Sequence, residues 1–310
     1  MTAEFEERHV QAVEKAGASI VNVRSGTSHG GACCGPFHRM GSGSGLVLDD
    51  KGHILTNHHV VCDMDSVTVI MGNGHVFTGK VVGGDQRTDI AVVKIESDEL
   101  VPAVLADSDD LKLGQPILAM GNSFGLPHGP VVTSGVVSYL PRGLSGHEGM
   151  IALWTDATIN PGNRGGALVD LDGNVIAVNA VRAPYAEGMG QAIPVNMAKS
   201  IAAQIIEHGK VQRAWLGVTA YDVTTALAYQ FQLPDTDGAF VAETAPEGPA
   251  ETAGLHMGDV VLSLDDKHVG NVSDLLTALT GMKSGQEIDV KVRRNGRTEA
   301  VRVTLGTRPY

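Results

Sequence analysis

The sequence predicts an all-β protein with few helices, organised as two successive units. From about residue 18 to residue 200, short apolar runs rich in β-branched residues alternate with glycine-rich turns. The 39 glycines and the aromatic content of only 4% fit short strands joined by tight turns. A length of 310 residues is sufficient for two domains. These features indicate β-barrels or β-sandwiches in the first unit.

The elements of the first unit follow one another along the chain. Residues 1–17 are acidic and amphipathic at their start and are expected to form a helical segment. Strands are expected at residues 20–23, 45–48, 67–70, 90–93 and 175–178. Apolar positions then recur at helical spacing from residue 196, and Gly209 marks the end of that helix. We place the first domain at residues 18–209.

The second unit is expected to span residues 213–307. Ser273 is positioned to cap a helix at residues 274–280, with Leu275, Leu276 and Leu279 on its inner side. A hairpin follows, in which alternating apolar residues flank the turn Asn295-Gly296. Its strands also carry a basic cluster of Lys291, Arg293, Arg294, Arg297 and Arg302. The solvated outer face of a hairpin accounts for that cluster.

Charge and hydropathy exclude some classes of partner. The formal net charge of −12 argues against nucleic acid as a partner. No apolar run approaches the roughly 20 residues that a membrane-spanning helix needs. The start of the sequence does not resemble a signal peptide, which predicts a cytoplasmic protein, or a periplasmic one if a leader was trimmed. The three cysteines are too few for a disulfide framework, so reduced thiols are expected.

Three motifs carry the chemistry. Thr-Asn-His-His-Val-Val occupies residues 56–61, Thr-Asp-Ile-Ala-Val-Val-Lys occupies residues 88–94, and Asn-Pro-Gly-Asn-Arg-Gly-Gly occupies residues 160–166. Gly-Asn-Ser-Phe-Gly-Leu at residues 121–126 lies between the second and the third. In this order and spacing the motifs resemble the HtrA/Deg family of serine proteases. The resemblance implies a two-barrel chymotrypsin/trypsin-like protease domain followed by a PDZ domain.

The resemblance also assigns roles within the protease domain. His59 corresponds to the general base, Asp89 to the carboxylate that orients it, and Arg164 stands where the family has its nucleophilic serine. The loop of Gly162, Asn163 and Arg164 corresponds to the oxyanion hole. Ile159 is expected in the primary specificity pocket, favouring a small apolar side chain, and Gln191 stands near it where a phenylalanine is common.

Arginine cannot perform the serine's chemistry. A guanidinium remains protonated at physiological pH and has no lone pair with which to attack a carbonyl carbon. Its length also requires it to point outward or to fill the substrate pocket, and Asp89 is one possible partner for its charge. Two hypotheses follow: a pseudoprotease that binds peptides or unfolded proteins, and an ATP-independent endopeptidase of protein quality control that a Ser-to-Arg substitution has inactivated. The presence of His59 and Asp89 favours the second hypothesis. The size of the arginine favours the first, in which the protein lost its proteolytic activity naturally.

The second unit resembles a PDZ domain. Its carboxylate-binding loop would be Trp215, Leu216, Gly217 and Val218, and Leu275 and Leu279 would line the groove. The resemblance implies binding of C-terminal peptide tails as an added strand. It also implies a homo-oligomer, a trimer to which the N-terminal helix contributes.

A metal-binding scaffold is the third hypothesis. His29, Cys33, Cys34 and His38 crowd one glycine-rich segment, and His58, His59 and Cys62 form a second candidate group. Either set has donor types suited to zinc or copper, but neither repeats a standard ligand motif. No cofactor is otherwise expected.

Overall fold

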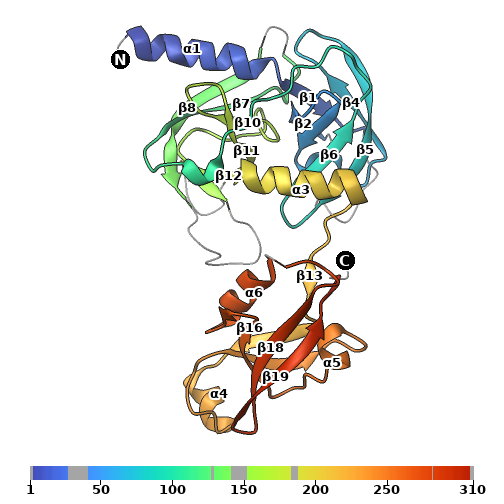
Figure 1. Ribbon diagram of the computed structural model, residues 1–310. Coiled ribbons are helices and arrows are strands. Elements are labelled where there is room, and N and C mark those ends of the chain that lie inside the picture. The colour runs from blue at the N-terminus through green and yellow to red at the C-terminus, as the bar shows by residue number, and fades with distance from the viewer. Residues whose placement is uncertain are drawn as a thin grey trace. The chain divides into compact units, whose positions relative to one another are not determined.

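The computed structural model describes residues 3–26, 41–126, 129–140, 152–182, 188–280 and 282–307. The chain divides into two compact units between Val211 and Gln212. The first begins with helix α1 (Ala3–Gly17) and continues as two closed six-stranded barrels, and the second is a smaller mixed unit (Figure 1). The expected all-β architecture with few helices is confirmed. No helix of the described residues is long and apolar enough to cross a membrane.

The first barrel is antiparallel and has the strand order β1-β2-β3-β6-β5-β4. Its strands are β1 (Ile20–Arg24), β2 (Ser42–Val47), β3 (His53–Thr56), β4 (Ser66–Ile70), β5 (Val76–Asp85) and β6 (Ile90–Lys94). The one-turn helix α2 (His58–Val61) follows β3 directly. Val21, Val23, Val69 and Val93 are fully buried in the barrel core, as β-branched residues on a closed sheet should be.

The second barrel has the strand order β10-β11-β12-β9-β8-β7. Its strands are β7 (Pro116–Gly121), β8 (Val131–Tyr139), β9 (Leu153–Thr155), β10 (Ala167–Val169), β11 (Val175–Arg182) and β12 (Gly190–Pro194), and the 3₁₀ turn η1 (Ser108–Asp110) precedes them. Helix α3 (Val195–His208) contacts β5 and β6 of the first barrel and β11 and β12 of the second (Figure 1). Gly209 ends it in the left-handed conformation that glycine tolerates.

The second unit is built on an antiparallel sheet with the order β14-β15-β16-β18-β19. Its elements are β13 (Ala214–Trp215), β14 (Val218–Asp222), α4 (Thr225–Gln230), β15 (Ala239–Thr244), α5 (Pro249–Thr252), β16 (Val260–Leu264), β17 (Lys267–His268), α6 (Val272–Thr280), β18 (Glu287–Arg294), β19 (Arg297–Thr304) and β20 (Gly306–Thr307). The expected hairpin is β18–β19, and both turn residues, Asn295 and Gly296, have positive φ.

One expected cap is wrong. Helix α6 begins at Val272, so Ser273 lies inside it. Asn271 accepts the hydrogen bond that the Asp274 backbone N–H donates, at 2.9 Å, and therefore caps the helix. Asparagine and serine are both good caps, and the Asp222 carboxylate, which accepts from the Val272 N–H at 2.8 Å, helps to place the first turn earlier in the sequence.

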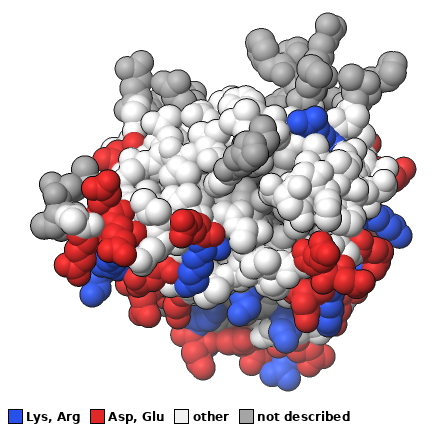
Figure 2. Space-filling model, turned by 90° about the horizontal axis from the view of Figure 1, so that it is seen from above, with Lys and Arg blue, Asp and Glu red and all other residues white. Residues whose placement is uncertain are grey.

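Charged side chains of both signs are interleaved on the surface. On the face in Figure 2 they alternate along one side, while the centre carries mostly uncharged residues. In the basic cluster of the hairpin, three arginines form ion pairs with aspartates: Arg293 with Asp235, Arg294 with Asp259, and Arg302 with Asp289. The cluster is thus largely neutralised by neighbouring carboxylates.

Candidate active site

The structure brings His59 and Asp89 together. His59 Nδ1 lies 2.8 Å from Asp89 Oδ2, and the His59 backbone N–H donates to Asp89 Oδ1 at 3.0 Å. Both side chains are mostly shielded, with 22% and 15% of their surface exposed. A carboxylate on Nδ1 fixes the ring orientation and favours the tautomer in which Nδ1 carries the proton and Nε2 does not. The geometry is that of a base with its orienting acid.

Backbone contacts hold Asp89 in position. Its carbonyl oxygen accepts hydrogen bonds from the His58 N–H at 3.1 Å and from Asn57 Nδ2 at 3.0 Å. Its φ of +55° is a conformation that few residues other than glycine adopt, although aspartate is among the more tolerant. Three donors therefore hold Asp89, namely the backbone N–H groups of His58 and His59 and the side chain of Asn57. Its carboxylate has little freedom to move away from His59.

The loop at residues 160–166 is anchored to the first barrel. The Ser44 N–H of β2 donates to the Arg164 carbonyl oxygen at 2.7 Å. Gly165 has φ +75°, and a Cβ atom there would lie 2.3 Å from the Ser44 carbonyl oxygen, so only glycine fits. Asn179 Nδ2 also donates to the Asn163 carbonyl at 3.1 Å. Sequence reasoning missed Ser44, although its position between Gly43 and Gly45 signals close backbone approach.

The three residues expected to form the oxyanion hole are not equivalent. Gly162 N–H donates to Asn160 Oδ1 at 2.7 Å, and Asn163 N–H donates to the Asn160 carbonyl at 3.1 Å. Within the described residues, the Arg164 N–H donates no hydrogen bond. An oxyanion site needs preorganised donors that converge on one point. In this conformation the Gly162 N–H is engaged by the Asn160 side chain.

The Arg164 side chain lines a cavity of about 460 Å³, which we call the Arg164 pocket. Its walls are residues 158–161, Arg164, Gly188 and Met189. Ile159 therefore lines the same cavity as Arg164, and Gln191 is not among the lining residues. Gly190, the neighbour of Gln191, faces Ile159, because a Cβ there would lie 2.7 Å from Ile159 Cγ1. Adjacent strand residues point to opposite faces, so Gln191 is turned away from Ile159.

Arg164 does not pair with Asp89 in the structure. Among the described residues it forms no ion pair within 4.0 Å, and its Nε is buried without a hydrogen-bond partner. Burial lowers the pKa of the Arg164 guanidinium from its ordinary value, and the charge of Asp89 opposes that effect. The guanidinium nevertheless stays protonated at neutral pH.

The second unit offers backbone donors at the expected carboxylate-binding loop. Leu216 and Gly217 use their carbonyl groups to accept from Ala250 and Ala245, at 2.9 and 2.8 Å. Their own N–H groups donate no hydrogen bond within the described part of the chain. Gly217 has φ +82°. Strand β14, which starts at Val218, is an edge strand of its sheet, so an extended peptide can pair with it.

The leucines of helix α6 differ in their environment. Leu275 is 2% exposed and belongs to the core of the unit, whereas Leu276 is 44% exposed. Val272, Leu276 and Leu279 are spaced i, i+4 and i+7, which places them on one stripe of the helix. Sequence reasoning put Leu276 on the inner side of the helix, which its exposure contradicts, whereas Val272 and Leu279 pack partly against the core. The i, i+4, i+7 spacing was the signal that identifies the stripe.

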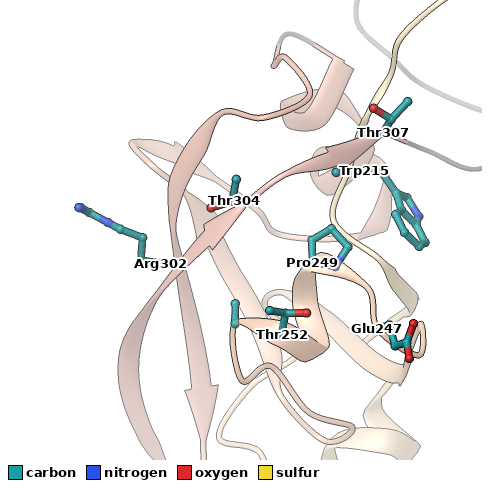
Figure 3. A pocket seen from close by; sticks show the side chains of 9 residues that line it. Trp215, Glu247, Pro249, Thr252, Arg302, Thr304 and Thr307 are labelled. Atoms are coloured by element: carbon teal, nitrogen blue, oxygen red, sulfur yellow. The ribbon is translucent and has the colours of Figure 1, made fainter.

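Trp215 belongs to a cavity outside helix α6. It lines a second cavity of about 580 Å³ together with Glu247, Pro249, Thr252, Arg302 and Thr304, among others, and no residue of α6 contributes (Figure 3). In Figure 3 the Arg302 side chain points away from Trp215, which stands beside Pro249. Trp215 therefore supports the wall formed by α5 and β20, and the backbone of its two successors provides the free donors.

Comparison with known proteins agrees with this geometry. Residues 43–178 match the family described as "Trypsin-like peptidase domain", and residues 215–305 match "PDZ domain". The solved structure "HtrA-type protease AlgW with decapeptide" superimposes with a TM-score of 0.84 and 32% identity, covering 97% of this chain and 99% of that chain. The chain belongs to the HtrA-type serine protease family. The expected two-barrel protease domain followed by a PDZ domain is confirmed.

Other HtrA-type relatives add detail. A serine endoprotease from Yersinia pestis superimposes with a TM-score of 0.78 and 32% identity, covering 97% of this chain and 98% of that chain. Curated proteins described as "Probable periplasmic serine endoprotease DegP-like" from Marinomonas sp. and Halomonas elongata are 39% and 40% identical over 274 residues, 87% of this chain. The chain spans 58% and 57% of the length of these two relatives. Their description as periplasmic does not support the cytoplasmic interpretation.

Cys62 corrects the expectation of reduced thiols. It is disulfide-bonded, and its sulfur is therefore not available as a thiolate ligand. Whether two cysteines form a disulfide depends on the distance between them in the fold, and the number of cysteines in the sequence does not reveal that distance. No group of three or more potential metal ligands occurs among the described residues, and His29, Cys33, Cys34 and His38 lie outside them. HtrA-type serine proteases use a triad and need no cofactor.

The environment of His58, the neighbour of His59, predicts that the stability of the fold depends on pH. Its Nδ1 is buried without a hydrogen-bond partner, and burial lowers the pKa of its imidazole below the ordinary value despite nearby carboxylates. A lowered folded-state pKa means that the unfolded chain binds the proton more readily, so this contribution to stability is present above about pH 6.5 and is lost as the pH falls.

We therefore expect His58→Gln to reduce the acid sensitivity of the chain. The measurement is the Tm of parent and variant at about pH 8 and about pH 5.5. The Tm of the parent should fall more from the higher to the lower pH than that of the variant. His75→Gln, at an exposed position, is the matched control and should behave as the parent. Equal losses in parent and His58→Gln would contradict the assignment.

Proposed function

We propose that this HtrA-type chain is a proteolytically inactive protein that binds peptides or unfolded proteins. The observation that carries the proposal is the side chain at position 164, a guanidinium that lies in the pocket beside an otherwise assembled His59–Asp89 pair. His59 has no hydroxyl to deprotonate at that position, and loss of the nucleophile removes essentially all triad chemistry. In this proposal His59, Asp89 and Arg164 occupy the three triad positions.

The PDZ domain supplies the proposed binding activity. The free N–H groups of Leu216 and Gly217 suit a terminal carboxylate, and the edge of β14 suits the backbone of the last peptide residues. Leu276 and Leu279 line the other side, which favours apolar residues near the peptide C-terminus. The family resemblance further suggests a homotrimer, which stays a prediction.

One experiment tests both halves of the proposal. The purified chain is incubated with casein, and in parallel it is titrated with a short fluorescent peptide that ends in an apolar residue with a free carboxylate. We expect no cleavage products and saturable binding that C-terminal amidation of the peptide abolishes. Cleavage of casein by the parent chain would overturn the proposed inactivity, and equal binding of acid and amide peptides would overturn the PDZ assignment.

The paired leucines of α6 provide a sharper test of the groove. Leu276→Ala should weaken peptide binding about tenfold, because burying a leucine side chain is worth roughly 1.5–3 kcal/mol. Its melting temperature should change little, since the side chain is already largely exposed. Leu275→Ala should instead destabilise the PDZ domain by about 2–5 kcal/mol, because it empties a buried site.

Isothermal titration and thermal melts of both leucine variants distinguish the two roles. Weaker binding by Leu276→Ala without loss of stability supports the groove described here. If Leu276→Ala binds the peptide as well as the parent does, the groove does not include that stripe of α6.

The intact base and orienting acid favour a second candidate, an ATP-independent serine endopeptidase inactivated by a Ser-to-Arg substitution. The two candidates share the same fold and groove and differ in whether the remaining machinery still functions. For the compartment, we propose the periplasm, as named for the relatives. The disulfide at Cys62 supports this, because such bonds persist mainly in oxidising compartments.

A further inference from the structure

Among the described residues the guanidinium of Arg164 has no direct ion-pair partner, although the charge of Asp89 acts on it. Within the described part of the chain no carboxylate lies within ion-pair distance, and Nε has lost its water without gaining a hydrogen bond. The Asp89 carboxylate is occupied by the ring and the backbone N–H of His59. Leaving a buried donor unsatisfied is unfavourable, and more so for a charged group.

The walls of the Arg164 pocket strengthen the attraction for an anion. None of its lining residues is acidic, and Ile159, Pro161 and Met189 give it an apolar surface. Charges interact more strongly next to such low-dielectric walls than in bulk water. A cavity of about 460 Å³ falls in the size range of small-ligand sites and leaves room for one side chain of a bound peptide.

Neutral donors lie on the same loop as the guanidinium. The Arg164 backbone N–H has no acceptor among the described residues. Asn160 lines the pocket, and because its Oδ1 already accepts from the Gly162 N–H, the amide nitrogen is the remaining polar group of its side chain. Arginine presents a planar fork that matches a carboxylate with two parallel hydrogen bonds.

We propose that Arg164 makes this pocket a subsite for a carboxylate group of a bound peptide. The inference rests on the proposed function, since it names what the same inactive site holds. An internal aspartate or glutamate side chain is the ligand that the proposal favours, and a peptide's terminal carboxylate has the same chemistry. The apolar specificity expected from Ile159 alone is thereby replaced by selection for negative charge.

An arginine that merely filled the pocket would act differently. It would weaken binding of all side chains by occupying their space, whatever their charge. A carboxylate subsite distinguishes glutamate from glutamine, which has nearly the same shape and no charge. The comparison of these two residues in otherwise identical peptides is therefore the decisive measurement.

The experiment uses the full chain and two short fluorescent peptides of small polar residues, one with a single central glutamate and one with glutamine. Both peptides are amidated at the C-terminus so that they lack the group that the PDZ loop recognises. By fluorescence anisotropy at low salt, we expect the glutamate peptide to bind about tenfold more tightly or better, as charge-assisted hydrogen bonds allow. Added salt should reduce the difference.

Variants at one position assign the effect. Arg164→Gln should bind both peptides equally, and Arg164→Lys, which keeps the charge but loses the planar fork, should retain part of the preference. A third peptide without glutamate but with a free C-terminus, measured in the Leu276→Ala background, tests the terminal carboxylate as the source. A preference for this peptide over its amide that Arg164→Gln removes would assign the terminal carboxylate to the pocket.

Two results would overturn the proposal. The first is equal affinity of the parent chain for the glutamate and glutamine peptides, and the second is a preference that survives in Arg164→Gln. Melting curves and binding of the apolar C-terminal peptide confirm that each variant is folded. Absence of casein cleavage and binding at the PDZ groove do not depend on these peptides, so this inference can fail while the proposed function stands.

Discussion

Replacing Arg164 with serine is expected to give cleavage of casein well above that of the parent chain. The His59–Asp89 pair is assembled at 2.8 Å, so the new hydroxyl would meet a base whose ring is already oriented. Loss of a triad nucleophile costs about 10⁶-fold in turnover, whereas an oxyanion donor that is not available costs about 10²–10³-fold. With Gly162 N–H engaged by Asn160, we expect a gain of roughly 10³-fold over the parent chain.

The matched control is the double variant Arg164→Ser with Asp89→Asn. It keeps the shape of the site but removes the charge that stabilises the protonated imidazole. In comparable triads this change costs about 10⁴-fold in turnover, which is more than the expected gain, so the double variant should lose all of the recovered activity. Release of acid-soluble fragments from labelled casein measures all three proteins. An Arg164→Ser variant that folds but stays inactive would show that the site has lost more than its nucleophile, and would sink the second candidate function.

Replacing Asp259 with alanine is expected to destabilise the PDZ domain by about 3–5 kcal/mol. Asp259 is 2% exposed, and its carboxylate accepts two hydrogen bonds from Arg294, both at 2.7 Å. Arg294 also donates to the Gly254 carbonyl at 2.7 Å, and the pair thus joins the start of β16 to the end of β18. Hydrogen bonding to Asp259 raises the pKa of Arg294, so its guanidinium stays charged at any ordinary pH.

Asp289→Ala is the matched control for this prediction. Asp289 makes the same two-point contact with Arg302, at 3.0 and 3.2 Å, but both side chains are about half exposed or more. Its loss should destabilise the domain far less than the loss of Asp259, because water replaces an exposed partner. Urea denaturation followed by Trp215 fluorescence, in a Trp154→Phe background, reports on the PDZ domain. Similar losses for the two aspartates would contradict the role given to burial.

Some of the site could be predicted from the sequence because it depends on residue type and order. Each of the three motifs, at residues 56–61, 88–94 and 160–166, occupies one continuous segment. Their order and spacing in the sequence therefore suffice to identify the family. The helix that Gly209 ends and the Asn295-Gly296 turn were predictable for the same reason: both depend on local backbone preferences.

Other features could not be predicted because they depend on contacts between distant segments. Leu275 and Leu276 are chemically identical neighbours, and their roles differ because successive helix residues point about 100° apart and only one direction meets the core. The disulfide at Cys62 likewise depends on proximity in space.

Position 164 shows the same division. The sequence by itself determined that no hydroxyl is available there, because the identity of a side chain decides whether it has a nucleophilic lone pair. Only the tertiary structure decided that the guanidinium lies unpaired in the pocket, that Asp89 remains with His59, and that Asn160 engages the Gly162 N–H. The physical reason is that the strength of an ionic interaction or a hydrogen bond depends on the distance between the two groups, and folding sets that distance.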